Sequence, residues 1–251
     1  MPSYLITGSS RGIGLGLVTE LLKNPENQVL ATARNPDTAK GLQELREQYP
    51  HTNRLSLLTI DISKLESITK AAQEAESLLP NGLDVLISNA GIFRNVSDTW
   101  DQIDTDEFLE ELSLNAISIL QLLRAFKPLV TKSVQKKVII ITSIGGSLEA
   151  AGEMPDHFAL TYSVGKAALN MLVRRWGKAY KKEGVTTVLI HPGWVGTAMG
   201  LAEVELTREM FPDVSPISVE ECTTNIVKVI GDVKLSDTVS FLSYDGHRLP
   251  W

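Results

Sequence analysis

The sequence contains one cysteine, Cys222, among its 251 residues. A single cysteine cannot form an intrachain disulfide, and without a His/Cys cluster a zinc site is not expected. We therefore expect no bound metal and assign Cys222 to helix packing.

The chain also lacks long apolar runs and an excess of positive charge. No apolar stretch approaches the about 20 residues that a membrane-spanning helix needs, and residues 1–4 carry no basic, apolar leader. The formal net charge is −6, so no overall basic field attracts nucleic acid. The sequence therefore predicts a cytoplasmic protein that binds neither membranes nor nucleic acid.

Short apolar runs typical of buried strands alternate with helical segments along the whole chain. Such alternation predicts a parallel sheet with helices on both faces. No repeat or low-complexity linker divides the chain, so we expect a single Rossmann-type, doubly wound α/β domain over 1–251. Capping-box spacing predicts helix starts at Asp104 with Glu107 and at Ser218 with Glu221. The expected strands are about seven: 3–7, 28–33, 55–59, 85–88, 138–142, 187–191 and 239–242.

The segment at 3–22 has the order strand, glycine-rich turn, helix. Gly8 permits the tight turn, Gly12 lets the backbone approach a pyrophosphate, and Gly14 removes a side chain where helix and strand lie close. The free amides at the helix start then face the phosphates. Three residues separate Gly8 from Gly12, unlike the G-x-G-x-x-G spacing, and a plain connection is the alternative. The strand and helix in the required order favour nucleotide binding.

The sequence YSVGK at 162–166 places Tyr162 and Lys166 on one face of a helix. A nearby ammonium stabilises an ionised phenol, so Tyr162 is a candidate proton donor and acceptor at a carbonyl. On its own, the same spacing arises in many helices as an amphipathic stem over a ring.

Six motifs occur in an order that resembles the short-chain dehydrogenase/reductase family. They are TGSSRGIG at 7–14, NAG at 89–91, Asn115 in LSLNAIS, Ser143 in ITSIGGS, YSVGK, and PGWVGT at 192–197. The ending DGHRLPW and the TARNP segment are similar to the branch with C-factor-type proteins, sniffer-type carbonyl reductases and fungal polyketide ketoreductases such as norsolorinic acid ketoreductase. The resemblance covers nearly the whole chain and implies the strand order 3-2-1-4-5-6-7.

The resemblance also implies roles for four catalytic residues. Ser143 would polarise the substrate carbonyl, and Tyr162 would supply the proton as hydride arrives from the nicotinamide. Lys166 would assist Tyr162 and bond the nicotinamide ribose, and Asn115 would hold a water on the proton path. A polar residue that kinks a helix is the alternative for Asn115. We interpret His191 as part of a buried strand rather than as a catalyst.

Cofactor contacts are implied for residues beyond the carboxyl ends of the strands. Asp61 resembles the residue that bonds the adenine amino group, although a helix cap is an equal alternative. Gly91 is either close to the adenine ribose or only a turn residue. The implied cofactor-binding set is Gly8, Ser10, Arg11, Gly12, Ile13, Gly14, Arg34, Asp61, Ile62, Asn89, Ala90, Gly91, Tyr162, Lys166, Pro192, Gly193, Val195 and Thr197.

The end of the second strand indicates the cofactor type. An Asp or Glu there would bond a ribose 2′-hydroxyl, but the chain has Ala33 and Arg34. A guanidinium suits a 2′-phosphate, and Arg11 lies on the other side of the expected site. We therefore predict NADPH/NADP+ rather than NAD. A solvated turn residue is the alternative for Arg34.

Two features depart from the family pattern. Ser143 and Tyr162 are 19 positions apart, a longer interval than usual, which indicates an inserted loop at 147–160 near the reaction centre. Ser147 is therefore a second candidate for the carbonyl-polarising serine. Gly165 stands where the family usually has serine, and loss of that hydroxyl is expected to loosen the helix start.

Apolar and charged segments are interpreted in relation to the substrate side of the site. The segment 198–217 is expected to form a substrate lid. Several large apolar side chains, named at the end of this paragraph, have two interpretations. They form an apolar pocket for an aromatic or polyketide-like ketone, or they fill the core. The acidic stretch 98–111 and the basic stretch 174–182 are interpreted as solvated helix faces. The pocket candidates are Phe93, Met154, Phe158, Trp194, Met199, Leu201, Met210 and Phe211.

These features predict an NADPH-dependent ketoreductase that acts on a small carbonyl compound, with a homodimer or homotetramer implied by the resemblance. One alternative is an NADP-dependent secondary-alcohol dehydrogenase. The other is a noncatalytic, nucleotide-sensing signalling protein, which an intact set of Asn115, Ser143, Tyr162 and Lys166 argues against.

Overall fold

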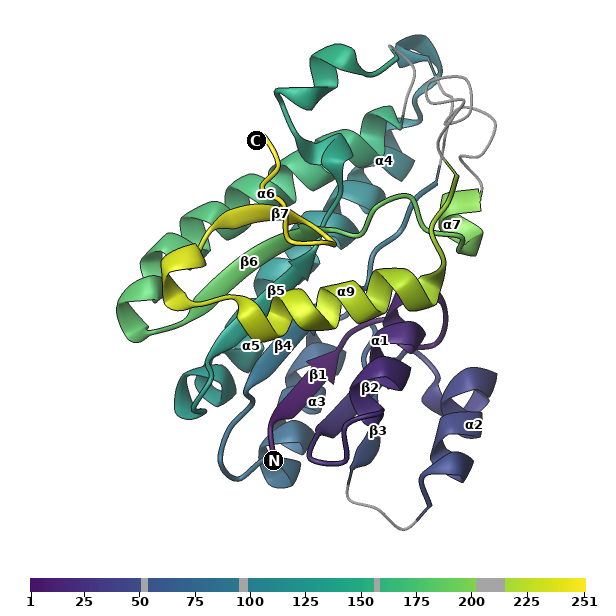
Figure 1. The fold of residues 1–251 in the computed structure, drawn as a ribbon. Coiled ribbons are helices and arrows are strands. Elements are labelled where there is room, and N and C mark those ends of the chain that lie inside the picture. The colour runs from purple at the N-terminus through teal and green to yellow at the C-terminus, as the bar shows by residue number, and fades with distance from the viewer. Residues whose placement is uncertain (51–53, 95–98, 156–158, 202–214) are drawn as a thin grey trace.

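The computed structural model describes residues 1–50, 54–94, 99–155, 159–201 and 215–251. Its centre is one parallel sheet of seven strands in the order β3-β2-β1-β4-β5-β6-β7, as predicted (Figure 1). The strands match the expected ones to within one residue at each end. They are β1 Ser3–Ile6, β2 Gln28–Ala33, β3 Leu55–Thr59, β4 Val85–Ser88, β5 Lys137–Ile141, β6 Thr186–His191 and β7 Ser240–Ser243.

Two layers of helices cover the sheet, and each layer has its own apolar core. In one core, α3, α5 and α6 pack on one face; in the other, α1, α2 and α9 pack on the opposite face. The strands are buried on both faces, which explains their continuous apolar runs. The helices are α1 Gly12–Leu22, α2 Lys40–Gln48, α3 Leu65–Leu78, α4 Thr105–Leu112, α5 Ser118–Lys132, α6 Leu160–Tyr180, α7 Ala198–Leu201 and α9 Val219–Asp232.

Side-chain caps start two of these helices at the predicted residues. The Asp104 carboxylate accepts from the amides of Asp106 and Glu107 at the start of α4. The Ser218 hydroxyl accepts from the Glu221 amide at 3.0 Å at the start of α9. Both caps satisfy amides that the first helical turn leaves without partners.

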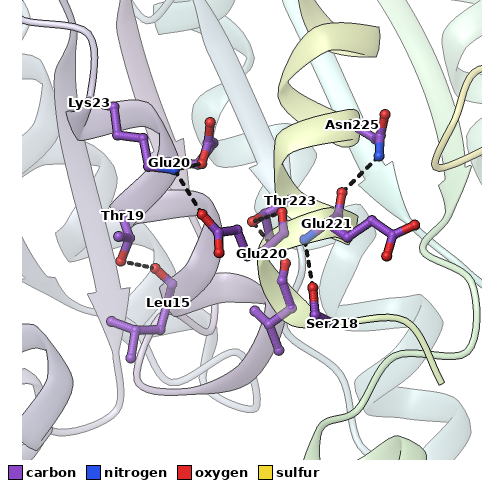
Figure 2. Close-up of polar contacts among 10 residues, drawn as sticks. Leu15, Thr19, Glu20, Lys23, Ser218, Glu220, Glu221, Thr223 and Asn225 are labelled. Atoms are coloured by element: carbon purple, nitrogen blue, oxygen red, sulfur yellow. Dashed lines mark hydrogen bonds and ion pairs between the residues drawn. The ribbon is translucent and has the colours of Figure 1, made fainter.

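Helix α9 packs directly against α1, the helix that follows the glycine-rich turn. Close approach depends on Gly16, since a Cβ there would lie 2.6 Å from a Val219 methyl carbon. Figure 2 shows the polar contacts beside this junction, where the Lys23 ammonium bridges Glu20 at 2.6 Å and Glu220 at 3.4 Å. The middle of α1 at Gly16 and its C-terminal end at Lys23 are therefore held by the start of α9, which is 197 positions from Lys23 at Glu220.

A π-helical turn at Ser113–Ile117 joins α4 to α5. The predicted alternative for Asn115 was a kinking residue, and the regular α-helix is indeed interrupted at this position. Turns of this type are frequent at functional sites because they change where a side chain points.

The C-terminal segment folds back on β7 and reaches the inserted loop. Arg248 forms an antiparallel bridge with Leu242, and the Trp251 carbonyl accepts from the Glu149 amide at 2.9 Å. The Trp251 ring packs 5.6 Å from the Phe241 ring and lies under the Arg174 guanidinium at 4.6 Å. These contacts join the end of the sequence, the inserted loop and α6.

No helix among the described residues is long and apolar enough to cross a membrane.

Candidate active site

The glycine-rich turn between β1 and α1 forms a shallow backbone cradle. Gly8 has φ +71° and lies against Ala90, whose Cα would be 2.9 Å from an added Cβ. A Cβ on Gly14 would lie 2.2 Å from the Gly8 carbonyl oxygen and 2.7 Å from the Asn89 amide nitrogen. Gly14 thus makes room for the turn itself and for the end of β4, rather than for the strand alone.

The first turn of α1 is open at its N-terminus. Its N-cap residue, Arg11, has extended backbone and makes no side-chain cap. The first amides of the helix therefore keep their capacity to bind an anion. Ser10 and Arg11 are exposed beside them, and Ile13 is partly buried. The cradle and the open amides fit a dinucleotide pyrophosphate.

Hydrogen bonds connect this turn to the end of β4. The Thr7 hydroxyl accepts from the amides of Asn89 and Ala90, at 3.0 and 3.1 Å. The Asn89 side-chain amide donates to the carbonyls of Thr7 and Gly8. The predicted residues at 89–91 therefore fix the glycine turn, in addition to any contact with a cofactor.

The segment after β6 closes the other side of the cradle. An added Cβ on Gly12 would lie 3.4 Å from the Thr197 methyl carbon, so Thr197 faces the glycine turn. Gly193 has φ +81°, and Val195 bridges to Ile217. The buried Cys222 thiol donates to the Pro192 carbonyl at 3.3 Å, in agreement with a packing role.

Arg34, Asp61 and Ile62 lie beyond the ends of β2 and β3. Arg34 is exposed. Burial raises the pKa of Asp61, but the hydrogen bonds from Ser63 and then the charges of Lys64 and Arg34 lower it, so the pKa lies below its ordinary value. The Asp61 carboxylate accepts from the Ser63 hydroxyl at 2.7 Å. The N-cap of α3 is Lys64, so Asp61 stabilises the preceding turn and does not cap the helix.

Tyr162 and Lys166 meet on one face of α6. The Lys166 ammonium lies 5.4 Å from the centroid of the Tyr162 ring and donates to the Ile141 carbonyl at 3.3 Å. Lys166 is 5% exposed, and burial lowers its pKa to about 8 despite the opposing charge of Glu111. The Phe93 ring contacts Tyr162 edge to face at 4.9 Å. A buried ammonium beside a phenol is an arrangement that can transfer a proton near neutral pH.

The Asn115 side chain holds the chain that leaves β4. Its oxygen accepts from the Ile92 amide at 3.0 Å, and its nitrogen donates to the Ile92 carbonyl at 2.9 Å. An added Cβ on Gly91 would lie 3.0 Å from the Asn115 oxygen and 3.7 Å from the Lys166 nitrogen. Gly91 has no positive φ, so it provides space near Lys166 and is more than a turn residue.

Ser143 and Ser147 differ in their surroundings. Ser143 follows β5, is partly exposed, and accepts from the Gly145 amide at 3.1 Å. Ser147 is 1% exposed, and its hydroxyl accepts from the Ala150 amide, within the inserted loop. These contacts favour Ser143 as the hydroxyl available to a substrate.

His191 supports the turn that carries Ser143. Its Nδ1 accepts from the Ile144 amide at 3.2 Å, which requires an unprotonated Nδ1. Although the residue keeps some exposure, burial of the ring lowers its pKa to about 4. His191 is therefore neutral at physiological pH and serves the strand end, as the sequence predicted.

His191 should make the fold sensitive to acid. Between pH 6.5 and pH 4 the unfolded chain binds a proton that the folded ring does not, so stability falls as pH falls. We expect a loss of about 1–2 kcal/mol from this residue between pH 7 and about pH 5. Urea unfolding at both pH values should show a smaller loss in His191→Asn. An equal loss in His191→Asn and in the wild type would contradict the assignment.

The described part of the substrate side is apolar. The Trp194 and Met154 side chains are partly buried, and the Trp194 ring nitrogen donates to the Gly200 carbonyl at 2.8 Å. Met199 and Leu201, in α7, are exposed. The predicted lid at 198–217 and inserted loop at 147–160 are described only in part. Phe158, Met210 and Phe211 lie outside the described residues.

Sequence reasoning missed one residue of this region, Glu111. It was assigned with the rest of 98–111 to a solvated helix face, but it is 1% exposed. Its carboxylate accepts from the Thr161 hydroxyl at 2.6 Å, next to Tyr162 in the chain. The spacing of four residues before Asn115 could have indicated the buried face, because residues four apart on a helix share a side.

Comparisons with known proteins agree with this geometry. A family model described as short chain dehydrogenase matches residues 3–206. An uncharacterized oxidoreductase of Schizosaccharomyces pombe, C663.06c, is 32% identical over 254 residues, covering 99% of this chain and 97% of the relative. The carbonyl reductase Sniffer of D. melanogaster is 30% identical, with a TM-score of 0.87 and coverage of 100% of both chains. An NADPH-bound carbonyl reductase from chicken fatty liver is 33% identical, with a TM-score of 0.87 and coverage of 100% of this chain and 94% of the other.

Fold, site and family model converge, and the chain belongs to the short-chain dehydrogenase/reductase family. Within that family it is an NAD(P)-dependent oxidoreductase, as the sequence predicted.

Proposed function

We propose that the protein is an NADPH-dependent carbonyl reductase that reduces a ketone or aldehyde, with Tyr162 as proton donor. The observation that carries this proposal is the buried Lys166 ammonium beside the Tyr162 ring, at the edge of the glycine cradle. The similarity to solved carbonyl reductases at about 30% identity supports it, and one of them is described as NADPH-bound.

Lys166 prepares Tyr162 for proton transfer. At pH 7 a lysine with a pKa of about 8 is mostly protonated, and its positive charge stabilises the phenolate that remains after Tyr162 gives up its proton. Holding this pair in place before the substrate arrives reduces the reorganisation needed during reaction. The carbonyl of Ile141 and the ring of Phe93 restrict where the two groups can move.

Ser143 and Asn115 complete the proposed set of catalytic residues. The Ser143 hydroxyl donates to the substrate oxygen and increases the positive charge on the carbonyl carbon. The Asn115 side chain keeps Ile92 and therefore Phe93 in position, and we assign to Asn115 the water that returns a proton to Lys166.

The cofactor would be held along the carboxyl ends of the strands. The amides at the start of α1 would bind the pyrophosphate, Thr197 and Val195 the nicotinamide end, and Asp61 with Ile62 the adenine. NADPH supplies the hydride when bound. Asn89, Ala90 and Gly91 keep this edge narrow and free of bulky side chains.

The substrate is proposed to be an uncharged, aromatic or polyketide-like ketone. The support is the Phe93 ring, which contacts the Tyr162 ring edge to face at 4.9 Å. An aromatic ring at this position favours flat, apolar ligands. A homodimer or homotetramer is proposed as the assembly, since Leu109 of α4 and Ile117 of the following π-helical turn are exposed apolar side chains.

A panel of carbonyl compounds tests the proposed function directly. NADPH consumption should be measured with aliphatic, aromatic and quinonoid carbonyls, and with NADPH replaced by NADH. We expect turnover that is fastest with aromatic ketones. Tight NADPH binding without turnover of any carbonyl, together with unchanged behaviour of Tyr162→Phe, would instead favour a nucleotide-sensing protein.

The Arg34→Ala variant should lose the preference for NADPH. Removing the guanidinium removes charge-assisted hydrogen bonds to the 2′-phosphate, worth about 1.5–3 kcal/mol, so KM for NADPH should rise about tenfold or more. KM for NADH, which has no 2′-phosphate, should change by less than about twofold. The matched control is Arg46→Ala, an exposed arginine of α2 that contacts Asp37. Equal KM values for both cofactors in the wild type would defeat the assignment.

A further inference from the structure

Glu111 is a buried carboxyl group that the proposed mechanism does not use. It lies in the last turn of α4 and is 1% exposed. Among the described residues, Glu111 and Lys166 are the only Asp, Glu, Lys, Arg or His side chains in the buried class. Burying a charge is costly unless another group compensates it, so the presence of Glu111 here requires a reason.

The first reason is a contact between two helices. The Thr161 hydroxyl donates to one Glu111 carboxylate oxygen at 2.6 Å, and a backbone hydrogen bond from Arg94 also stabilises the carboxylate and lowers its pKa. One helical turn further on, Asn115 faces Gly165, where an added Cβ would lie 3.6 Å from the Asn115 Cβ. Glu111 and Asn115 are therefore paired with Thr161 and Gly165 at the same spacing of four residues.

This pairing fixes the two catalytic positions of α6. Tyr162 directly follows Thr161, and Lys166 directly follows Gly165. A shift of α6 along α4 would move both side chains relative to Asn115 and Gly91. The hydrogen bond from Thr161 to Glu111 opposes such a shift at the end of α6 where Tyr162 lies.

The second reason is charge. Burial lowers the pKa of Lys166 to about 8, and the negative charge of Glu111 acts in the opposite direction. Burial raises the pKa of Glu111, while the Thr161 hydrogen bond and the charges of Arg94 and Lys166 lower it. Each of the two buried groups therefore favours the ionised form of the other.

We propose that Glu111 is a positioning residue of the active site, which holds the start of α6 through Thr161 and preserves the positive charge of the Lys166 ammonium. This inference rests on the proposed function, because that function gives Lys166 its task. Glu111 does not touch substrate or cofactor in this assignment; it acts through Thr161 and Lys166.

Few of the described charged or polar groups face Glu111 and Lys166. Lys166 is faced by Tyr162 from its own helix, by Glu111 from α4 and by the Ile141 carbonyl from β5. Glu111 is also near Arg94, whose guanidinium pairs with the neighbouring Glu110. Glu110→Gln therefore changes the charge near Arg94 without changing the buried carboxylate, which makes it the matched control.

The test is the pH dependence of NADPH affinity, measured by the fluorescence of the bound cofactor between about pH 6 and about pH 10. If Lys166 bonds the nicotinamide ribose, affinity should weaken where Lys166 loses its proton. In Glu111→Gln this transition should move down by about one pH unit or more, because removing a nearby negative charge makes proton loss easier. At pH 8 the variant should bind NADPH several-fold more weakly than the wild type, and at pH 6 equally well.

Two further variants separate the charge from the hydrogen bond. Thr161→Val removes the hydroxyl and keeps the carboxylate, so it should weaken affinity by a similar factor at every pH and leave the transition in place. Thr161→Ser keeps the hydroxyl and should restore wild-type affinity. An unmoved transition in Glu111→Gln, or an equal shift in Glu110→Gln, would overturn the proposal.

A failure of the proposed function can be distinguished from a failure of the Glu111 proposal. If Lys166→Met binds NADPH with wild-type affinity and pH dependence, the role of Lys166 at the cofactor is wrong. The Glu111 proposal is then decided by the tyrosinate absorbance of the wild type minus that of Tyr162→Phe. The first deprotonation of the Tyr162/Lys166 pair should occur at lower pH in Glu111→Gln, and an unchanged titration would reject the proposal.

Discussion

The Tyr162→Phe variant should reduce carbonyls about 10²- to 10⁴-fold more slowly than the wild type, which is the range that a positioned general acid contributes. The substitution removes only the hydroxyl. The edge-to-face contact with Phe93 at 4.9 Å and the position under the Lys166 ammonium depend on the ring, which phenylalanine keeps. The loss should therefore appear in kcat, with KM for NADPH changed by less than about threefold.

The measurement is single-turnover oxidation of bound NADPH with the best carbonyl of the panel. The matched control is Tyr180→Phe, in the same helix, where the ring packs on Trp176 at 4.3 Å and the hydroxyl is far from Lys166 in sequence. Tyr180→Phe should retain full activity. Wild-type turnover in Tyr162→Phe would remove Tyr162 from the reaction and with it the proposed mechanism.

The Gly14→Ala variant should lose both stability and cofactor affinity. A Cβ at this position would lie 2.2 Å from the Gly8 carbonyl oxygen, a backbone atom, and 2.7 Å from the Asn89 side chain. Neither atom can move without displacing the turn that forms the cradle. Overpacking of this kind costs about 1–3 kcal/mol, so the unfolding free energy should fall by at least that amount. NADPH affinity should fall by tenfold or more, since about 1.4 kcal/mol corresponds to a factor of ten.

Urea unfolding and NADPH titration measure the two effects. Gly231→Ala provides the matched control, because this glycine is also helical and an added Cβ there meets nothing within 4 Å. That change should stabilise the protein by about 0.5–1 kcal/mol, the usual gain for alanine in a helix. If Gly14→Ala binds NADPH as well as Gly231→Ala does, the turn is not the pyrophosphate site.

Much of the fold was predictable because the strands of a doubly wound sheet are buried on both faces. Continuous apolar runs such as VLIS at 85–88 and TTVLIH at 186–191 mark such strands directly. Helix starts were predictable at Asp104 and Ser218 because a capping side chain acts within its own turn. The strand order came from family resemblance, since no local pattern specifies which strands are neighbours.

The site was predictable where its chemistry is local and less so where it depends on distant contacts. Tyr162 and Lys166 share a helix, so their spacing was sufficient to place them together. The two hydrogen bonds between the Asn115 side chain and the Ile92 backbone join segments 23 residues apart in the sequence. No local sequence pattern predicted these hydrogen bonds.

Glu111 shows most clearly why such contacts escape a sequence. A glutamate in an acidic stretch is usually solvated, and the groups that accompany its burial, Thr161 and Lys166, lie 50 or more positions away in the sequence. Asp61 is a related case, because the alternatives of helix cap and adenine ligand both overlooked the turn that its carboxylate stabilises through Ser63.

The return of the C-terminal segment toward residues 147–155 has a consequence for the exchange of segments between homologues. The Glu149 amide donates to the Trp251 carbonyl and the Trp251 ring packs against Phe241, so Glu149 and β7 are joined through Trp251. Chimeras that exchange only the segment around Glu149 should therefore lose the contact with Trp251 and unfold more easily, whereas exchange of both segments together should preserve it.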